Sequence, residues 1–288
     1  MFITRAISAL TLLAIVVVLF IFGGYPLAGA LLLISCIGFW ELSKALANPN
    51  AEIGAERAPL PNKKKVDSMD IIGMVGIVFY YVAMVFFKQP VYQFCIVIIF
   101  IMAILFVYVF SFPKIYIGRI SNVAFSFIYC PVMLSFIYMV KETENYGDWL
   151  IWLVLISSWG CDTFAYLFGV AFGKRKIFPV LSPNKSLAGC IGGLVSSAVL
   201  GGLYGYFYVA KVTGRPYIFI VTAIMCLVGG LMGMIGDLVA SGIKRNKGFK
   251  DYAKLIPGHG GIMDRFDSTI ITAAAVYALS IVLVNQNF

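Results

Sequence analysis

The residue types that could carry out chemistry are concentrated in one polar segment, residues 241–267. It holds six lysines and arginines, three aspartates and the only histidine of a 288-residue chain, His259. Carboxylate oxygens are the ligands that hard divalent cations prefer, and lysine and arginine side chains complement phosphate oxygens. Together these residue types indicate phosphoryl or nucleotidyl transfer, in which catalysis depends on positioning the phosphates and stabilising their charge.

Helical spacing extends this polar segment toward the N-terminus. Asp237 is followed at i+4, i+7 and i+8 by Ser241, Lys244 and Arg245. If one helix continues through these positions, all four side chains lie on the same face. The spacing therefore predicts one wall of a site, built from a carboxylate, a hydroxyl and two cations.

A glycine-rich loop follows, with Gly258, Gly260 and Gly261 around His259. Glycine permits positive backbone dihedral angles and lets main-chain N–H groups approach an anion closely. Substitution by alanine should therefore disturb this loop although no side-chain function is lost. For His259 we keep three roles open: contact with phosphate or orientation of a neighbouring group, general acid–base catalysis, and structure only.

The last apolar segment is expected to start near residue 262, which places Asp264 and Asp267 on one face of its first turn. With Asp237 they predict three carboxylates that converge on the cation-rich loop. Mg²⁺ is usually held in this way, by a few carboxylates together with substrate phosphates.

The composition around the polar segment is that of an integral membrane protein. Hydrophobic residues make up 61% of the chain, charged residues 12%, and the mean hydropathy is +0.94. Apolar stretches of about 20 residues, the helix length that crosses about 30 Å of hydrocarbon, recur along the whole sequence. They predict an all-α, polytopic bundle of about nine membrane-spanning helices, approximately at 5–22, 27–44, 70–87, 91–112, 117–140, 148–172, 187–210, 217–240 and 267–286.

The distribution of lysine and arginine predicts the orientation of these spans. If the spans alternate in direction, all but four of the 22 lysines and arginines lie on the side of the N-terminus, the four being Lys88, Lys141, Lys211 and Arg215. By the positive-inside rule that side, including residues 241–267, faces the cytoplasm. The net charge of +9 then favours anionic headgroups and phosphate-bearing substrates. Nucleic acid is not expected as a partner, because no compact soluble domain is predicted to bind it.

Residues 1–147 and residues 148–288 are expected to differ in role. The first part carries its charges in loops or at helix ends and is interpreted as a transmembrane scaffold. The second part is interpreted as the catalytic region, with cytoplasmic loops at 173–186 and 241–266. Within it, Asp162 lies inside the sixth apolar stretch, where an aspartate costs about 2.5–3.5 kcal/mol to insert. Asp162 is therefore either a functional residue or a buried acid hydrogen-bonded to a neighbouring helix.

The order of these residues resembles the signature of the phosphatidate cytidylyltransferases, the CDP-diacylglycerol synthases. The signature corresponds here to Ser241-x-x-Lys244-Arg245, Lys250-Asp251 and Pro257-Gly258-His259-Gly260-Gly261-x-x-Asp264-Arg265-x-Asp267. Upstream, the resemblance continues in residues 162–166, 172–174, 182–186 and 236–238. It therefore spans about residues 155–270.

The resemblance implies an enzyme that joins CTP and phosphatidic acid to give CDP-diacylglycerol and pyrophosphate. It implies Mg²⁺ as cofactor, with a second cation left open, and it assigns Asp237, Asp264 and Asp267 to the metal. No protein nucleophile is expected, because the lipid phosphate would attack the α-phosphorus of CTP. The catalytic residues that it implies are Asp237, Lys244, Arg245, Lys250, Asp251, His259, Asp264, Arg265 and Asp267. The substrate-binding residues are Asp162, Ser182, Lys185, Ser241, Gly258, Gly260 and Gly261.

Two other interpretations of the sequence remain open. A CTP-dependent polyprenol or phytol kinase would share the membrane setting and the phosphate-binding residues, but would release CDP instead of pyrophosphate. An ion-coupled transporter would account for Asp162 and Asp237 within apolar segments and for the glycine-rich, interrupted helices. The resemblance also leads us to expect a homodimer, and the short loops lead us to expect a bacterial inner membrane.

Overall fold

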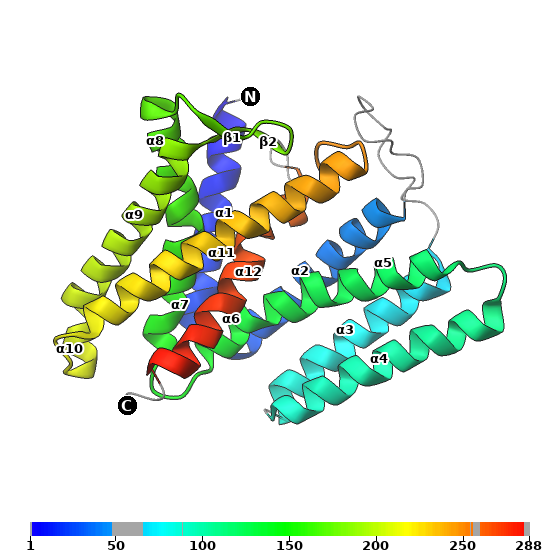
Figure 1. Cartoon of the computed structure of the whole chain (residues 1–288). Coiled ribbons are helices and arrows are strands. Elements are labelled where there is room, and N and C mark those ends of the chain that lie inside the picture. Colours follow the sequence, from blue (N-terminus) through cyan, green and yellow to red (C-terminus); the bar gives the residue numbers. More distant parts are fainter. Residues whose placement is uncertain (1, 48–65, 88, 254, 256–259, 285–288) are drawn as a thin grey trace. The chain divides into compact units, whose positions relative to one another are not determined.

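The structure is a computed structural model that describes residues 2–47, 66–87, 89–253, 255 and 260–284. Within these ranges the chain is helical apart from loops and one short hairpin, as the sequence predicts (Figure 1). Eight of the described helical segments are long and apolar enough to cross a membrane. Helix α1 (Phe2–Phe22) contains a further, shorter apolar stretch, Leu10–Phe22, so the described helices are consistent with the predicted bundle of about nine. Helices suit this setting because hydrocarbon offers no hydrogen bonds to main-chain groups.

Two sets of residues each form a compact unit. The first unit contains the residues up to Ser135 together with Ile243–Arg265, and the second contains Phe136–Gly242 together with the residues from Phe266 onward. The polar segment is therefore shared between them. The scaffold and catalytic roles of residues 1–147 and 148–288 stay a prediction.

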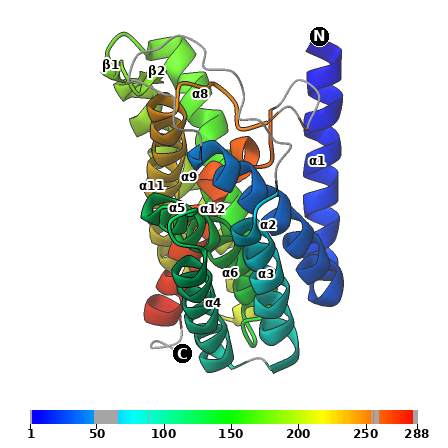
Figure 2. The same ribbon diagram turned by 90° about the vertical axis from the view of Figure 1, so that its right-hand side faces the viewer.

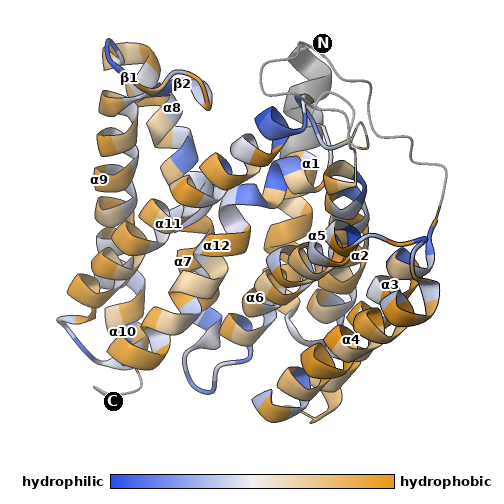
Figure 3. Cartoon of the chain, turned by 45° about the vertical axis from the view of Figure 1, so that its right-hand side comes forward, coloured by the Kyte–Doolittle hydropathy of each residue, from blue (hydrophilic) through white to orange (hydrophobic). Residues whose placement is uncertain are grey.

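The first unit is built from helices that follow one another along the chain. They are α2 (Gly24–Leu46), α3 (Ser68–Phe87), α4 (Pro90–Ser111) and α5 (Ile117–Phe127). Helix α2 packs against α3 and α5, and α3 packs against α4 (Figure 2). Helix α4 has a mean hydropathy of 3.0 over its most apolar window, of which only 11% is buried, and Figure 3 shows apolar residues along its length. Its exposed face is therefore interpreted as a lipid-contacting surface.

Several of the described spans contain π-helical turns, one of them in the first unit and three in the second. Within the fifth span, α5 passes through a π turn (Ile128–Val132) that contains Pro131 into α6 (Met133–Lys141). Proline cannot donate the main-chain hydrogen bond of a regular helix, which explains the local change. The remaining helices are α7 (Gly147–Leu155), a π turn (Ile156–Gly160), α8 (Cys161–Phe172), α9 (Leu187–Tyr204), a π turn (Gly205–Val209), α10 (Ala210–Thr213), α11 (Ile218–Asn246), α12 (Met263–Leu279) and a final π turn (Ser280–Val284).

A short hairpin stands where the sequence analysis expected only a loop at residues 173–186. Strands β1 (Lys176–Phe178) and β2 (Ser182–Ser186) pair antiparallel. The hairpin leads directly into α9, and the Ser186 side chain caps that helix by accepting the main-chain N–H of Gly189 at 3.2 Å. The hairpin thus holds Ser182 and Lys185 close to the first turn of α9.

Helices α8 and α9 approach each other closely enough for their main chains to touch. An added Cβ at Gly189 would lie 2.6 Å from the carbonyl oxygen of Ala165, and one at Gly193 would lie 2.8 Å from that of Cys161. Small residues permit such close helix packing in membranes. The glycines of α9 therefore determine where α8, and with it Asp162, can lie.

Candidate functional site

A pocket of about 270 Å³ in the second unit collects several of the predicted site residues. Asp162 enters from α8, Asp237 from α11 and Lys185 from strand β2. The other lining residues are mainly small or polar: Ala165, Tyr166, Ser182, Asn184, Ser186, Gly189, Cys190 and Met234. We call this set the Asp237 pocket. Two carboxylates, one cation and several hydroxyl or amide groups suit the binding of a phosphate-bearing ligand.

The ion pair between Lys185 and Asp237 is the main charged contact of the pocket. Lys185 Nζ lies 2.7 Å from Asp237 Oδ2 and also donates to the carbonyl oxygen of Met234 at 3.2 Å. The two side chains are 18% and 29% exposed. Because both groups face an open volume, either one can accept a ligand contact without first being uncovered.

Asp162 makes a contact with a neighbouring helix and also lines the pocket, so the choice between its structural and functional interpretations stays open. The Ser268 hydroxyl donates to Asp162 Oδ2 at 2.9 Å, so the acid is hydrogen-bonded to a neighbouring helix. The same side chain also lines the Asp237 pocket. It lies in the first turn of α8, directly after the π turn Ile156–Gly160, a feature that often accompanies functional sites.

The crossing of α11 and α12 places Asp267 beside the turn that carries Asp237. A Cβ at Gly236 would lie 2.5 Å from the carbonyl oxygen of Asp267. The Asp267 residue is only 9% exposed, and its Oδ1 accepts the main-chain N–H of Ser268 at 2.9 Å. Any larger residue at position 236 would push the two helices apart, so this glycine is required by close packing.

A second cluster, in the first unit, surrounds Asp264. Its Oδ1 accepts a hydrogen bond from Lys244 Nζ at 3.0 Å, and its Oδ2 accepts the main-chain N–H groups of Tyr252 at 2.9 Å and Gly261 at 3.0 Å. The Asp264 side chain is 4% exposed and that of Lys244 14%. We call these residues the Asp264 cluster. The buried carboxylate ties the described ends of the polar loop to the last turns of α11.

Helix α11 continues through its polar end, as the spacing of Asp237, Ser241, Lys244 and Arg245 predicted. It ends at Asn246, and Gly248 follows with a φ of 68°. The N–H of Phe249 then donates to the carbonyl oxygen of Lys244 at 3.0 Å, which closes the helix end. The helix therefore continues through Arg245 and breaks at residues 247–248.

The other predicted site residues differ in exposure. The side chains of Arg245 and Lys250 are exposed, and those of Ser241, Asp251 and Arg265 are partly buried. Gly260 has a φ of 82°, which favours glycine, and a Cβ there would lie 2.8 Å from Asp264 Oδ2. Gly258 and His259 lie outside the described residues.

These contacts do not bring the three predicted metal ligands together in one described cluster. In the described part of the chain, no three His, Cys, Asp or Glu side chains gather as ligands for one ion. The pair of carboxylates that shares a pocket is Asp162 and Asp237. The assignment of Asp237, Asp264 and Asp267 to a metal stays a prediction.

Sequence analysis missed the contribution of Glu41. Glu41 is one of the charges of residues 1–147 that were interpreted as lying in loops or at helix ends, yet its Oε2 accepts the main-chain N–H of Met263 at 3.0 Å. Asn184 and Ser186 of the Asp237 pocket were also not singled out. The available signal was an acid within an apolar helix, which normally has a specific partner.

Comparison with known proteins matches nearly the whole chain to one protein family. A profile described as the cytidylyltransferase family matches residues 3–283. The phosphatidate cytidylyltransferase of Bacillus subtilis is 30% identical over 227 residues, which cover 75% of this chain and 81% of that protein. That of Staphylococcus aureus is 42% identical over 143 residues, 50% of this chain and 52% of that protein. That of Staphylococcus saprophyticus is 41% identical over 137 residues, 48% and 50% of the two chains.

Proposed function

The chain belongs to the cytidylyltransferase family, and we infer that it is a membrane-embedded nucleotidyltransferase that acts on phosphatidate. Its reaction joins CTP and phosphatidic acid to give CDP-diacylglycerol and pyrophosphate. Neither of the alternatives, a lipid-alcohol kinase or an ion-coupled transporter, is favoured by the family match or by its relatives.

The observation that carries this proposal is the Asp237 pocket. It combines Lys185, which can neutralise phosphate oxygens, with the carboxylates of Asp162 and Asp237 in one open volume. Ser182 and Ser186, both from strand β2, also line the pocket. Phosphate transfer needs these elements together, because the reacting phosphates carry charge that must be both held and neutralised.

Nucleotidyltransferases of this kind use a divalent cation, and we propose Mg²⁺. The donor set fits this ion, because Mg²⁺ is often held by one or two carboxylates together with substrate phosphates and water. Asp237 would be a ligand, and Asp162 either a second ligand or an orienting group. Asp264 and Asp267 are retained as proposed ligands from the sequence signature. When bound, such a cation would neutralise charge on the triphosphate and make pyrophosphate a better leaving group.

The protein residues would hold and neutralise the two phosphate-bearing substrates. We propose that Lys185 holds triphosphate oxygens in the Asp237 pocket, exchanging its contact with Asp237 for one with CTP. The exposed cations Arg245 and Lys250 would attract the nucleotide and the lipid headgroup, and Lys244 and Arg265 would position the loop. An oxygen of the phosphatidate phosphate then forms a bond to the α-phosphorus of CTP. The bond from that phosphorus to pyrophosphate breaks, so atoms and charge balance without a protein nucleophile.

The membrane orientation and the assembly are also proposals. The excess of lysine and arginine on one side supports an active site that faces the cytoplasm, in a bacterial inner membrane. CTP would then enter from the aqueous phase and phosphatidate from the bilayer. A homodimer is proposed from the family resemblance alone.

The function can be tested with purified protein, phosphatidic acid and CTP labelled in the α-phosphate. We expect label in the lipid phase and an equal amount of pyrophosphate, both abolished by EDTA and restored by Mg²⁺. Transfer of label to lipid from γ-labelled CTP, with release of CDP, would instead identify a kinase. A folded sample that turns over no CTP would contradict both forms of nucleotide chemistry.

A further inference from the structure

Glu41 is a buried acid of α2 that contacts the start of the catalytic segment. The residue is 3% exposed, and its Oε2 accepts the main-chain N–H of Met263, the first residue of α12, at 3.0 Å. The first N–H groups of a helix lack partners within the helix, and an acceptor there satisfies one of them. A carboxylate at this end is also favoured by the helix dipole. Glu41 therefore acts as an N-terminal cap that comes from a distant helix.

The same carboxylate lies directly against the glycine loop. A Cβ added at Gly261 would lie only 2.7 Å from Glu41 Cδ, closer than real side chains approach. A side chain at position 261 would therefore force the Glu41 carboxylate to move, because that carboxylate occupies the space that the Cβ would take. The short stretch from residue 261 to residue 263 is thus held by Glu41 through both a hydrogen bond and close packing.

This stretch also supports Asp264, whose Oδ2 accepts the N–H of Gly261 at 3.0 Å. Movement of the main chain at Gly261 would displace one of the two main-chain donors that bind the Asp264 carboxylate. Glu41 is therefore connected to Asp264 through the short stretch 261–263, which it contacts by packing at Gly261 and by a hydrogen bond at Met263. A small displacement here would matter, because catalytic groups tolerate little departure from their working geometry.

Helix α2 is itself well anchored where Glu41 stands. One turn before Glu41, Gly38 allows close approach of residues 130 and 263: a Cβ there would lie 2.5 Å from Cys130 Sγ and 3.4 Å from Met263 Sδ. After Glu41, the side chains of Ser43 and Lys44 bind Asp70 of α3 at 2.9 and 2.5 Å.

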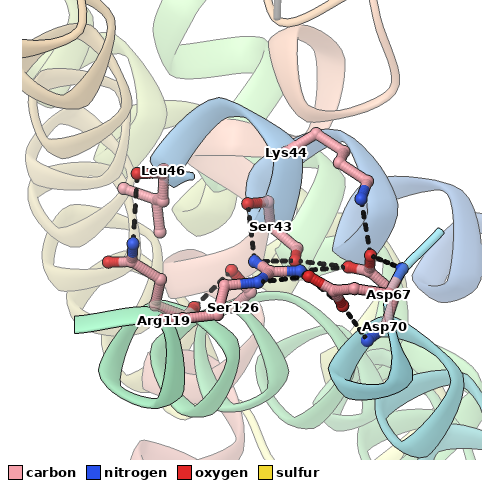
Figure 4. A network of polar contacts seen from close by, with 8 residues as sticks. Ser43, Lys44, Leu46, Asp67, Asp70, Arg119 and Ser126 are labelled. Carbon is pink, nitrogen blue, oxygen red and sulfur yellow. Dashed lines mark hydrogen bonds and ion pairs between the residues drawn. The ribbon is translucent and has the colours of Figure 1, made fainter. Parts of the chain in front are cut away.

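Figure 4 shows how this anchor is completed by α5. Arg119 donates to Asp70 at 2.6 Å, to Asp67 at 2.9 and 3.1 Å, and to the Ser43 carbonyl oxygen at 3.2 Å. Two cations and two carboxylates thus join α2, α3 and α5. We call Lys44, Asp67, Asp70 and Arg119 the buried ionic network. It holds the end of α2 in place and with it the position of Glu41.

We propose that Glu41 is a positioning residue for cytidylyl transfer, which holds residues 261–263 and through them the Asp264 carboxylate. The proposal rests on the proposed function, and it assigns a role in the reaction to a helix of the presumed scaffold. Glu41 acts by accepting a hydrogen bond at a set distance, so reach matters more than charge.

The test compares Glu41→Gln, Glu41→Asp and Glu41→Ala in the CTP and phosphatidate assay. Glutamine keeps an acceptor oxygen at the same reach, so we expect its kcat to stay near that of the wild type. Aspartate keeps the charge but retracts the carboxylate, and alanine removes it, so we expect kcat to fall by about 10- to 100-fold in both. KM for either substrate should change little, because Glu41 is buried and in this proposal acts only by positioning residues 261–263.

Asp148→Asn provides the matched control. Asp148 is an acid of another helix, in the first turn of α7, but its side chain is 89% exposed and it pairs with Lys141 at 2.5 Å. We expect wild-type kcat and KM from this variant. The folded state of every variant is measured by size-exclusion chromatography and thermal unfolding in detergent.

A double-mutant cycle with Gly261→Ala tests the packing step separately. Alanine at position 261 should lower kcat because it collides with the Glu41 carboxylate. If Glu41 causes the defect, Glu41→Ala with Gly261→Ala should be no slower than Glu41→Ala alone.

The outcomes separate this proposal from the proposed function. Wild-type protein that makes no CDP-diacylglycerol contradicts the function itself. Active wild type with folded Glu41→Asp at wild-type kcat overturns only the positioning role, as does a Glu41→Gln variant that is slower than Glu41→Asp. If Glu41→Ala does not fold, the aspartate and glutamine variants still decide between these results.

Discussion

Two ionic clusters of this protein use the same residue types but differ in exposure. In the buried ionic network, the fully buried Asp70 carboxylate lies 2.5 Å from Lys44 and 2.6 Å from Arg119. In the Asp237 pocket, the carboxylate of Asp237 is 29% exposed and lies 2.7 Å from Lys185. The distances are similar, so the strength of the direct contact does not distinguish the two clusters.

The difference lies in what each cluster can still bind. The buried ionic network balances two cations with two carboxylates; Lys44, Asp70 and Arg119 are enclosed between α2, α3 and α5, and only Asp67, at the start of α3, is partly exposed. Such a network is stable only when complete, because an unpaired buried charge is costly. The Asp237–Lys185 pair borders an open volume and can exchange one protein contact for a ligand contact. The Asp237 pocket and the buried ionic network therefore differ less in the charges they contain than in their access to an open volume.

The largest effect on activity is expected from Asp237→Asn. The amide keeps the size of the side chain but cannot supply a negative oxygen to a cation or balance Lys185, so we expect kcat to fall about 100- to 1000-fold. Thermal unfolding should change little, because the side chain is partly exposed. Near-normal turnover with wild-type Mg²⁺ dependence would remove Asp237 from the site.

The opposite pattern is expected from Asp70→Asn. Removal of the Asp70 negative charge weakens the ion pairs of the buried Lys44 and Arg119 side chains. This should lower the free energy of unfolding by about 3 kcal/mol or more. Thermal unfolding in detergent would detect this as a lower Tm, while kcat per folded molecule should fall far less than in Asp237→Asn. An unchanged Tm would show that the network is not a stabilising element.

A smaller effect on turnover is expected from Asp162→Asn. The amide oxygen can still accept the Ser268 hydroxyl, so the link between α8 and α12 should survive while the charge in the pocket is lost. We expect kcat to fall by about 10-fold, with an altered Mg²⁺ requirement measured by titration of activity. Wild-type kinetics would favour the interpretation of Asp162 as a structural acid only.

The smallest effect is expected from Lys250→Ala. This exposed side chain would attract CTP or lipid phosphate over a distance, and salt weakens such attraction. We expect KM for one substrate to rise by about two- to threefold at low salt, with the difference disappearing at high salt. The dependence on Mg²⁺ should not change. A KM and kcat equal to wild type at low salt would exclude Lys250 from substrate capture.

Much of the fold was predictable because membranes impose simple rules on sequence. The spans were located to within a few residues, and the last was expected near residue 262 and begins at Met263. The continuation of α11 through Lys244 was also predicted, since i+4, i+7 and i+8 spacing is a local property of one helix. The hairpin at residues 176–186 and the π turns were not predicted. They are short deviations that apolar periodicity does not encode.

The sequence by itself determined the membrane setting, the helical architecture and the set of chemically active residue types, because each depends on composition or on spacing along one helix. Only the tertiary structure decided which residues share a pocket. It joined Asp162, Lys185 and Asp237, which come from three elements, and it brought Glu41 to Met263 across 222 positions of the chain. Such contacts depend on how closely helices pack, and that is set by glycines such as Gly38 and Gly261 whose absent side chains leave room for a partner.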